Sequence, residues 1–194
     1  QRNANALPSH WEAIGVIKRV IHEQSLHDSI IVSEGANTMD VSRVALDEIA
    51  LPCRRLDAGR WGTMGSGLGF TLAACKTVNS ASCVITIQGD SAFGFSGMEL
   101  ETLVRYKCKA LIIIFNNGGI YTGCSDNATS FNPGVQHDQL MTAFGGFGLS
   151  TRQASIYDTL NAAIGLIKDG KYPVLVDILI DPTSGTVSGS LCKL

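Results

Sequence analysis

Two side chains that directly follow hydrophobic runs of the sequence carry oxygen atoms suited to a hard metal ion. Asp90 comes after the run that ends at Gly89, and Asn117 follows the run from Ala110 to Asn116. Magnesium takes few protein oxygens and fills its other octahedral positions with phosphate oxygens and water. Asp90, Asn117 and a nearby main-chain carbonyl group therefore predict half of a magnesium shell. Spacing alone leaves open a second interpretation, in which Asp90 caps the next helix and Asn117 lies in a turn.

Glycine is concentrated at the same kind of position. Four segments follow hydrophobic runs, and three of them are rich in glycine: residues 34–38, 59–69, 89–91 and 116–119. Glycine lets backbone N–H groups approach a phosphate closely, and the N-terminus of a following helix favours its negative charge. These segments predict a phosphorylated ligand. A dinucleotide-binding fingerprint is a poorer match, because its third glycine would fall at position 70, which is Phe70.

The elements that position these segments alternate between strands and helices. A capping box of Ser9 and Glu12 indicates the start of the first helix. Hydrophobic periodicity predicts helices at 10–24, 39–49, 66–79, 97–107, 137–144 and 156–168, and strands at 29–33, 54–57, 83–88, 110–116, 149–152 and 174–180. Continuous apolar strands such as Ile112 to Ile114 are typical of a parallel sheet covered on both faces. We therefore expect a three-layer α/β/α sandwich with a mainly parallel sheet, whose ligands bind beyond the carboxyl ends of the strands.

Composition limits the function classes. The 194 residues are 45% hydrophobic and 16% charged, which suits one compact domain over residues 1–182, followed by a small, polar tail or lid over 183–194. A net charge of -2 without long basic runs predicts no nucleic-acid partner, and no apolar run approaches the roughly 18 residues of a membrane span. The six cysteines lack Cys-x-x-Cys spacing and are typical of reduced thiols.

The two chemistry-bearing segments together match a known signature. Gly89-Asp90-Ser91, followed by 24 residues and then Asn116-Asn117, resembles the thiamine-diphosphate motif. Residues 89–99 and 116–121 are similar to the oxalyl-CoA decarboxylase and 2-hydroxyacyl-CoA lyase group of that superfamily, and so are 34–38, 55–65 and 181–189. Ser91 departs from the usual second glycine of the superfamily but fits this group. The likeness covers nearly the whole chain.

The resemblance implies roles for individual residues. It implies that Mg²⁺ is held by Asp90, Asn117 and the carbonyl group of Gly119. It places the diphosphate against Ser91, Ala92 and a turn formed by Ala36, Asn37 and Thr38. It makes the Gly62 carbonyl an acceptor for the aminopyrimidine ring and Met64 the apolar support that bends the cofactor. Further cofactor-binding positions are Gly89, Ile120 and Tyr121. The alternative for Met64 is a core residue, but Met64 is flanked by Gly62 and Gly65 and not by a helical apolar stripe, which favours the cofactor role.

By the same likeness the chain is the C-terminal part of a carbon-carbon lyase that cleaves 2-hydroxyacyl-CoA. Bound thiamine diphosphate would supply the carbanion that attacks a carbonyl group and the electron sink for the broken bond. The alternatives are an oxalyl-CoA decarboxylase, another enzyme of the superfamily resembling acetolactate synthase or benzaldehyde lyase, and a binding module without activity.

The resemblance implies no catalytic residue in this chain. The glutamate that activates the pyrimidine ring belongs to a separate N-terminal domain of a partner subunit, and a middle domain helps to bind CoA. The chain corresponds to about the last third of such a subunit, which we expect to form a homo-oligomer, a dimer or tetramer. Glu34 is not a substitute because it belongs to the diphosphate-side turn, and Glu99 and Glu101 lie in the helix after Asp90.

The C-terminal residues bear on location and substrate. Cys192-Lys193-Leu194 nearly matches the peroxisomal Ser-Lys-Leu signal, which predicts a peroxisome or related microbody, with the cytoplasm as the alternative. The decarboxylases that the chain resembles typically carry a basic residue after the Ser-Gly of the tail. Here Ser190 follows Ser188-Gly189, a departure that weighs against the decarboxylase.

Overall fold

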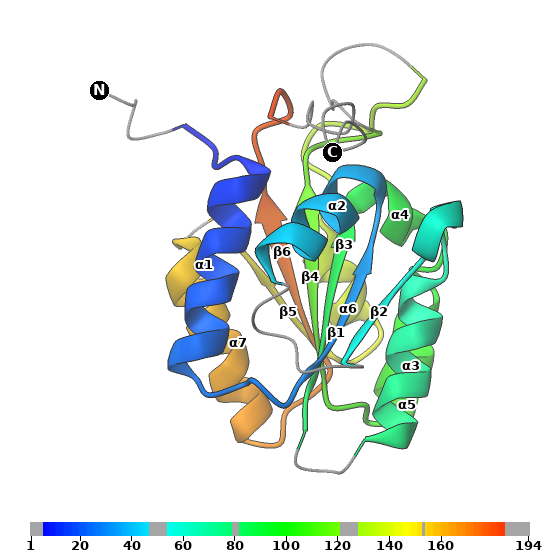
Figure 1. Ribbon diagram of the computed structural model, residues 1–194, viewed down its shortest axis with the longest axis vertical. Coiled ribbons are helices and arrows are strands. Elements are labelled where there is room, and N and C mark those ends of the chain that lie inside the picture. The colour runs from blue at the N-terminus through cyan, green and yellow to red at the C-terminus, as the bar shows by residue number, and fades with distance from the viewer. Residues whose placement is uncertain (1–5, 47–53, 79–81, 121–127, 153, 185–194) are drawn as a thin grey trace.

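The protein is built around a six-stranded parallel sheet. The computed structural model describes residues 6–46, 54–78, 82–120, 128–152 and 154–184. The strands are β1 (Ile30–Glu34), β2 (Arg55–Asp57), β3 (Val84–Gly89), β4 (Ala110–Asn116), β5 (Phe147–Ser150) and β6 (Val174–Leu179). They lie in the order β2-β1-β3-β4-β6-β5, and every neighbouring pair is parallel (Figure 1). All carboxyl ends therefore meet at one edge of the sheet, the upper edge in Figure 1.

Helices cover both faces of this sheet. They are α1 (His10–Glu23), α2 (Ala36–Ala45), α3 (Gly67–Thr77), α4 (Asp90–Gly94), α5 (Glu99–Arg105), α6 (His137–Ala143) and α7 (Ile156–Lys168), with a short 3-10 helix, η1 (Gly59–Trp61). Side chains of α1, α2 and α7 pack in one hydrophobic core, and side chains of α3, α4, α5 and α6 pack in another. The sheet separates the two cores, which confirms the expected three-layer α/β/α sandwich.

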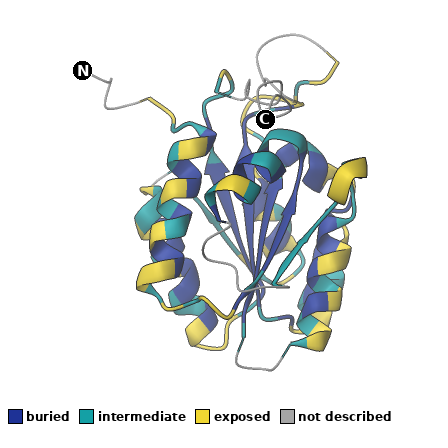
Figure 2. Ribbon diagram, in the orientation of Figure 1, coloured by how far each residue is buried: buried dark blue, intermediate teal, exposed yellow. Residues whose placement is uncertain are grey.

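The central strands show why the layers form. Every residue of β4 is buried, and so are the first five of β3 (Figure 2). Alternate residues face opposite cores: Ile113 packs against the α1 and α7 side, whereas Ile112 and Ile114 pack against the α3 and α5 side. Strands that are apolar on both faces can only be satisfied by helices on both faces, as the sequence pattern predicts.

One predicted helix boundary is wrong, and one helix was not predicted. Helix α2 begins at Ala36 and not at 39, because Gly35 adopts a φ of 101° and turns the chain straight from β1 into the helix. Residues Ala36, Asn37 and Thr38 are therefore its first turn, not a separate turn before it. The short helix α4 was not predicted from the sequence, because a run of glycine, serine and phenylalanine shows no helical periodicity over five residues.

The other boundaries differ less. Strand β5 covers 147–150 where the sequence predicted 149–152, and α1 begins at the predicted capping box, with the N–H group of Glu12 donating to the Ser9 side chain. Helix α2 ends at Ala45, and residues 47–49 of the predicted 39–49 helix lie outside the described part of the chain. Free thiols are found at Cys75, Cys83 and Cys108. Within the described residues, no helix is both long and apolar enough to cross a membrane.

The start of the predicted tail is tied to the beginning of the chain. The N–H group of Asp181, just after β6, donates to the carbonyl oxygen of Pro8 at 2.9 Å. The Ser184 hydroxyl group lies 3.2 Å from Nδ1 of His10, the first residue of α1. Residues 185–194, which include Cys192-Lys193-Leu194, lie outside the described residues. The division at residue 182 stays a prediction.

Candidate functional site

A pocket of about 200 Å³ opens at the edge where the strands end. Segments that follow β1, β3 and β4 form most of its wall. The lining residues are His10, Gly35, Ala36, Asn37, Thr38, Met64, Gly89, Asp90, Ser91, Ala92, Phe95, Asn117, Gly119 and Ile120. The structure thus brings together eleven of the thirteen site residues predicted from the sequence. Gly62 is not part of the lining, and Tyr121 lies outside the described residues.

Among the described residues of this wall, Asp90 carries the single carboxyl group. It is 1% exposed, and its Oδ2 accepts hydrogen bonds from the N–H groups of Gly118 at 2.8 Å and Gly119 at 3.0 Å. Its Oδ1 accepts from the N–H group of Ser91 at 2.6 Å. The N-cap residue of α4 is Gly89, so Asp90 is not a helix cap as the second interpretation supposed. It instead connects the β3 and β4 turns.

Burial has an electrostatic consequence for this carboxyl group. It raises the pKa of Asp90 above its ordinary value, while the N–H groups of Gly118, Ser91 and Gly119 lower it in part. A buried carboxylate is stabilised further by a nearby cation, which favours the charged form. Among the described residues no group of three or more His, Cys, Asp and Glu side chains could hold a metal ion. A cation here would therefore use one carboxylate with amide and carbonyl oxygens, the donor set that Mg²⁺ accepts.

The turn after β4 supplies those neutral oxygens. Asn117 is 9% exposed, and the next two residues have left-handed backbone, with φ of 84° at Gly118 and 151° at Gly119. Gly119 forms an antiparallel bridge with Ser130, and a Cβ atom on it would lie 2.5 Å from the carbonyl oxygen of Thr129. Only glycine fits between the two segments, so the sequence motif Asn-Gly-Gly reflects a close backbone approach.

Replacing Gly119 with alanine should therefore destabilise the fold. The strained φ and the clash with the Thr129 carbonyl together predict a loss of about 2 kcal/mol in unfolding free energy. The matched control is Gly165→Ala in α7, where a Cβ atom meets nothing within 4 Å and no loss is expected. Urea denaturation of both variants tests this, and equal stability of the two would contradict the assignment of Gly119 to a backbone contact.

Two helix N-termini form the side of the pocket that the sequence predicts to face phosphate, here called the phosphate side. The turns that lead into α2 and α4 approach each other closely, since a Cβ atom on Gly35 would lie 3.2 Å from the Gly89 nitrogen. The side-chain oxygen of Asn37 is buried without a hydrogen-bond partner. An amide end rotated by half a turn presents N–H donors at the same place. The start of the ten-residue α2, which has no side-chain cap, and an unsatisfied amide together suit an anion.

Met64 has a defined position in the wall of the pocket. It lines the pocket with 37% of its surface exposed. The segment that carries it connects η1 to α3 and has left-handed backbone at Gly62 and Gly65, with φ of 58° and 90°. Met64 is not packed in either hydrophobic core, so the alternative of a core residue is wrong.

Three lining residues were not among the predicted site residues: Gly35, which lies in the predicted segment 34–38, and also His10 and Phe95. His10 is 4% exposed, its ring packs edge-on against Phe115 with 5.6 Å between centroids, and burial lowers its pKa. No motif marks it, because α1 lies far from the signature in sequence. Phe95, 70% exposed, follows α4 and lines the mouth. Its position between Gly94 and Ser96 within the resembled segment was the only available signal.

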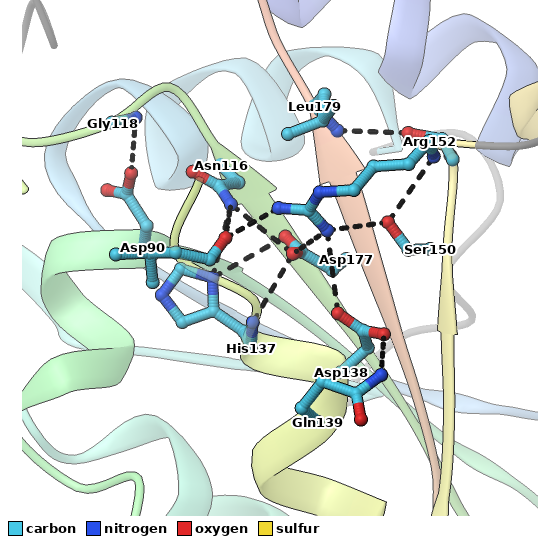
Figure 3. A network of polar contacts seen from close by, with 12 residues as sticks. Asp90, Asn116, Gly118, His137, Asp138, Gln139, Ser150, Arg152, Asp177 and Leu179 are labelled. Atoms are coloured by element: carbon cyan, nitrogen blue, oxygen red, sulfur yellow. Dashed lines mark hydrogen bonds and ion pairs between the residues drawn. The ribbon is translucent and has the colours of Figure 1, made fainter. Parts of the chain in front are cut away.

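A buried polar network supports the β4 turn from behind (Figure 3). The Asn116 side chain donates to Oδ2 of Asp177 and to the carbonyl oxygen of Val135, both at 3.3 Å. Asp177 on β6 is fully buried, and Nη1 of Arg152 donates to its Oδ2 at 2.9 Å. The N–H group of His137 donates to the same oxygen at 3.3 Å. The network fixes Asn116, the residue directly before Asn117. Asn117 and Asp90 both lie in the pocket wall.

Two opposing effects act on Asp177. Burial raises the pKa of its carboxyl group, but hydrogen bonds with His137 and Arg152 outweigh it, so the net pKa is lowered. Arg152 itself is three-quarters buried and also donates to the Ser150 hydroxyl group at 2.7 Å. Sequence reasoning did not identify this network, because its members come from β4, β5, β6 and α6 and share no spacing.

Comparison with known proteins identifies relatives of the same kind. Residues 34–178, about three quarters of the chain, match the family model described as thiamine pyrophosphate enzyme, C-terminal TPP binding domain. The chain is 40% identical to oxalyl-CoA decarboxylase of Escherichia coli K12, over 96% of the chain and 33% of the relative. It is 44% identical to 2-hydroxyacyl-CoA lyase of Arabidopsis thaliana, over 84% and 30%. The chain thus spans about a third of the length of these relatives.

A solved structure agrees with the fold. It comes from Mycobacterium smegmatis, is described as a thiamin diphosphate-dependent enzyme, and superposes with a TM-score of 0.67 at 18% identity. The match covers 93% of this chain and 34% of the other. Sequence motif, family model and relatives agree, and the chain belongs to the thiamine pyrophosphate enzyme family as its C-terminal TPP-binding domain.

Proposed function

We propose that this chain holds the diphosphate of thiamine diphosphate through Mg²⁺ and forms part of an enzyme that cleaves a carbon-carbon bond in a 2-hydroxyacyl-CoA. The observation that carries the proposal is the meeting of Asp90, Asn117 and Gly119 with the start of α2 in one pocket. Together they offer oxygen donors for a hard cation beside N–H donors for an anion. The donor set and the unsatisfied amide of Asn37 fit a magnesium-bound diphosphate.

In this proposal each residue has a binding task. Asp90, Asn117 and the Gly119 carbonyl group would hold the metal ion. Ser91, Ala92 and the first turn of α2 would hold the diphosphate. Gly62 and Met64 would contact the aminopyrimidine side, and Gly89, Ile120 and Tyr121 would complete the cofactor contacts. The bound cofactor supplies an electron sink for carbon-carbon cleavage, and the chain's own residues bind and orient it.

The lyase is favoured over the decarboxylase as the activity. Relatives of both names match this chain at similar identity. Position 190 is a serine and not a basic residue, which weighs against the decarboxylase. The substrate would be bound with the help of other domains, because the chain spans about a third of its relatives.

Large apolar side chains near the pocket support assembly with further domains or subunits. Trp61 is 94% exposed, and Phe95 and Met98 are each 70% exposed. Exposed apolar surface of this kind marks interaction sites. We propose a homo-oligomer in which these side chains are covered, located in peroxisomes through Cys192-Lys193-Leu194.

The test compares this chain with the full-length polypeptide that carries it. With thiamine diphosphate and Mg²⁺, the full-length protein should consume a long-chain 2-hydroxyacyl-CoA faster than oxalyl-CoA, as measured by chromatography of the CoA esters. The isolated chain should show no turnover, because the glutamate that activates the cofactor is expected in another domain. Faster consumption of oxalyl-CoA would assign the decarboxylase activity. Cleavage by the chain alone would contradict the expectation that the activating glutamate lies in another domain.

A further inference from the structure

Glu34 is a buried acid that the binding tasks above leave unused. It is the last residue of β1 and 1% exposed, and it does not line the pocket. Its Oε1 accepts a hydrogen bond from the N–H group of Ser66 at 2.8 Å, and its Oε2 accepts from that of Gly67 at 3.1 Å. The side-chain amide of Gln88 also donates to Oε2. The carboxyl group therefore occupies the N-terminus of α3.

The position of Glu34 in the chain connects two walls of the pocket. Its backbone directly precedes Gly35, where the turn into α2 and the phosphate side begin. Its side chain accepts hydrogen bonds from the N–H groups of Ser66 and Gly67. The segment that carries Gly62 and Met64 ends at these two residues. One residue thus links the diphosphate wall to the wall on which Met64 lies.

The contact between Glu34 and α3 leaves no slack. A Cβ atom on Gly67 would lie 2.5 Å from Oε2 of Glu34 and 2.6 Å from the side-chain nitrogen of Gln88. The carboxyl group therefore packs directly against the start of α3. Glycine at position 67 is required by this approach and not by its backbone angle.

The segment from Gly59 to Ser66 is held by hydrogen bonds at its two ends. At its start, Arg43 donates to both carboxyl oxygens of Asp57 at 2.8 Å and to the Gly59 carbonyl oxygen at 3.0 Å. Between the ends, left-handed backbone occurs at Gly59, Gly62 and Gly65. Glycine restricts the backbone least, so the position of Met64 is set by these end contacts. Glu34 makes the contact at the far end.

We propose that Glu34 is a positioning residue, which holds the Gly62 to Met64 segment in register with the diphosphate turn so that both ends of thiamine diphosphate are bound together. This inference rests on the proposed function. It predicts that a change at Glu34 alters the affinities for two ligands differently, whereas a purely structural role would alter both alike. Inorganic diphosphate with Mg²⁺ uses only the phosphate wall, whereas thiamine diphosphate uses both walls.

The test is Glu34→Gln in the full-length polypeptide that carries this chain. A glutamine side chain has one acceptor oxygen, so in either orientation its amide group faces an N–H donor of Ser66 or of Gly67. Affinity for thiamine diphosphate with Mg²⁺ should fall about 10-fold, the effect of one lost hydrogen bond to a charged group. Affinity for inorganic diphosphate with Mg²⁺ should stay unchanged. Titration calorimetry measures both, and Glu99→Gln on the exposed side of α5 is the matched control.

A second measurement follows the segment itself. Arg60 is exposed in η1, so trypsin cleavage after it reports the mobility of the segment. Glu34→Gln should speed this cleavage, and in the unchanged protein thiamine diphosphate should slow it while inorganic diphosphate does not. Gly67→Ala, which pushes on the same carboxyl group from α3, should reproduce both effects and serves if the Gln variant does not fold.

The outcomes separate the two proposals. If the unchanged protein binds no thiamine diphosphate in the presence of Mg²⁺, the proposed function fails and this inference fails with it. If it binds, but Glu34→Gln weakens both ligands equally or neither, the inference alone is overturned. Unchanged cleavage after Arg60 in both variants would overturn it as well.

Discussion

Replacing Asp90 with asparagine is expected to lower the magnesium-dependent affinity for thiamine diphosphate by about 100-fold or more. The substitution removes the one carboxylate that the described part of the pocket wall contains, and Mg²⁺ gains much of its affinity from charged oxygen ligands. The amide group would also face the N–H groups of Gly118 or Ser91, which now donate to the carboxyl oxygens. The measurement is a titration of the full-length polypeptide with cofactor, with and without Mg²⁺.

The control for this variant is Asp169→Asn at the exposed end of α7. It removes the same charge far from the pocket and should leave cofactor affinity unchanged. Thermal melting of the Asp90 variant shows whether the fold persists, since the lost backbone contacts lower stability to some extent. If magnesium-dependent binding survives in a folded Asp90→Asn protein, the metal assignment is wrong.

Removing the guanidinium group of Arg152 is expected to destabilise the fold by about 3 kcal/mol. Asp177 is fully buried, and Arg152 donates to it at 2.9 Å, so Arg152→Ala leaves a buried charge without this partner. Urea denaturation at pH 7 measures the loss. A second change, Asp177→Asn, should restore part of it, because the neutral side chain no longer needs a cation.

The same pair predicts a pH dependence with a definite sign. The pKa of Asp177 is lowered in the folded protein, so the pair stabilises the fold above the ordinary carboxyl pKa of about 4 and loses this contribution as pH falls through the folded value. The gap between the unchanged protein and Arg152→Ala should therefore shrink in acid. Arg105→Ala, which breaks an exposed pair with Glu101, is the control and should change stability little. A gap that widens in acid would contradict the role of Asp177.

The strands and the presence of Asp90 and Asn117 in one pocket were predictable for one physical reason. In a parallel sheet the carboxyl ends share one edge, so residues such as Asp90 and Asn117 meet whatever their separation in sequence. Apolar runs locate the strands, and the residues after them locate the edge. The family motif then assigns chemistry to positions that spacing alone leaves ambiguous.

What the sequence did not predict depends on contacts across elements. Glu34 looked like part of the diphosphate-side turn, but its side chain alternates away from the pocket and enters the N-terminus of α3. His10 reaches the pocket because α1 packs beside β4, a contact that no local pattern records. Arg152, two residues after β5, reaches Asp177 on β6, and the register of these two strands becomes known only from the sheet.

The hydrogen bond between Asp181 and Pro8 has a consequence for how such a domain joins other parts of a protein. Because these residues are in contact at the strand-end rim, the two ends of the described chain, near Pro8 and Asp181, meet at one point. That point adjoins the pocket, since His10 belongs to its wall. In the proposed function, a further domain joined to either end would start beside the cofactor without crossing the sheet, so a linker of few residues would suffice to bring it over the pocket.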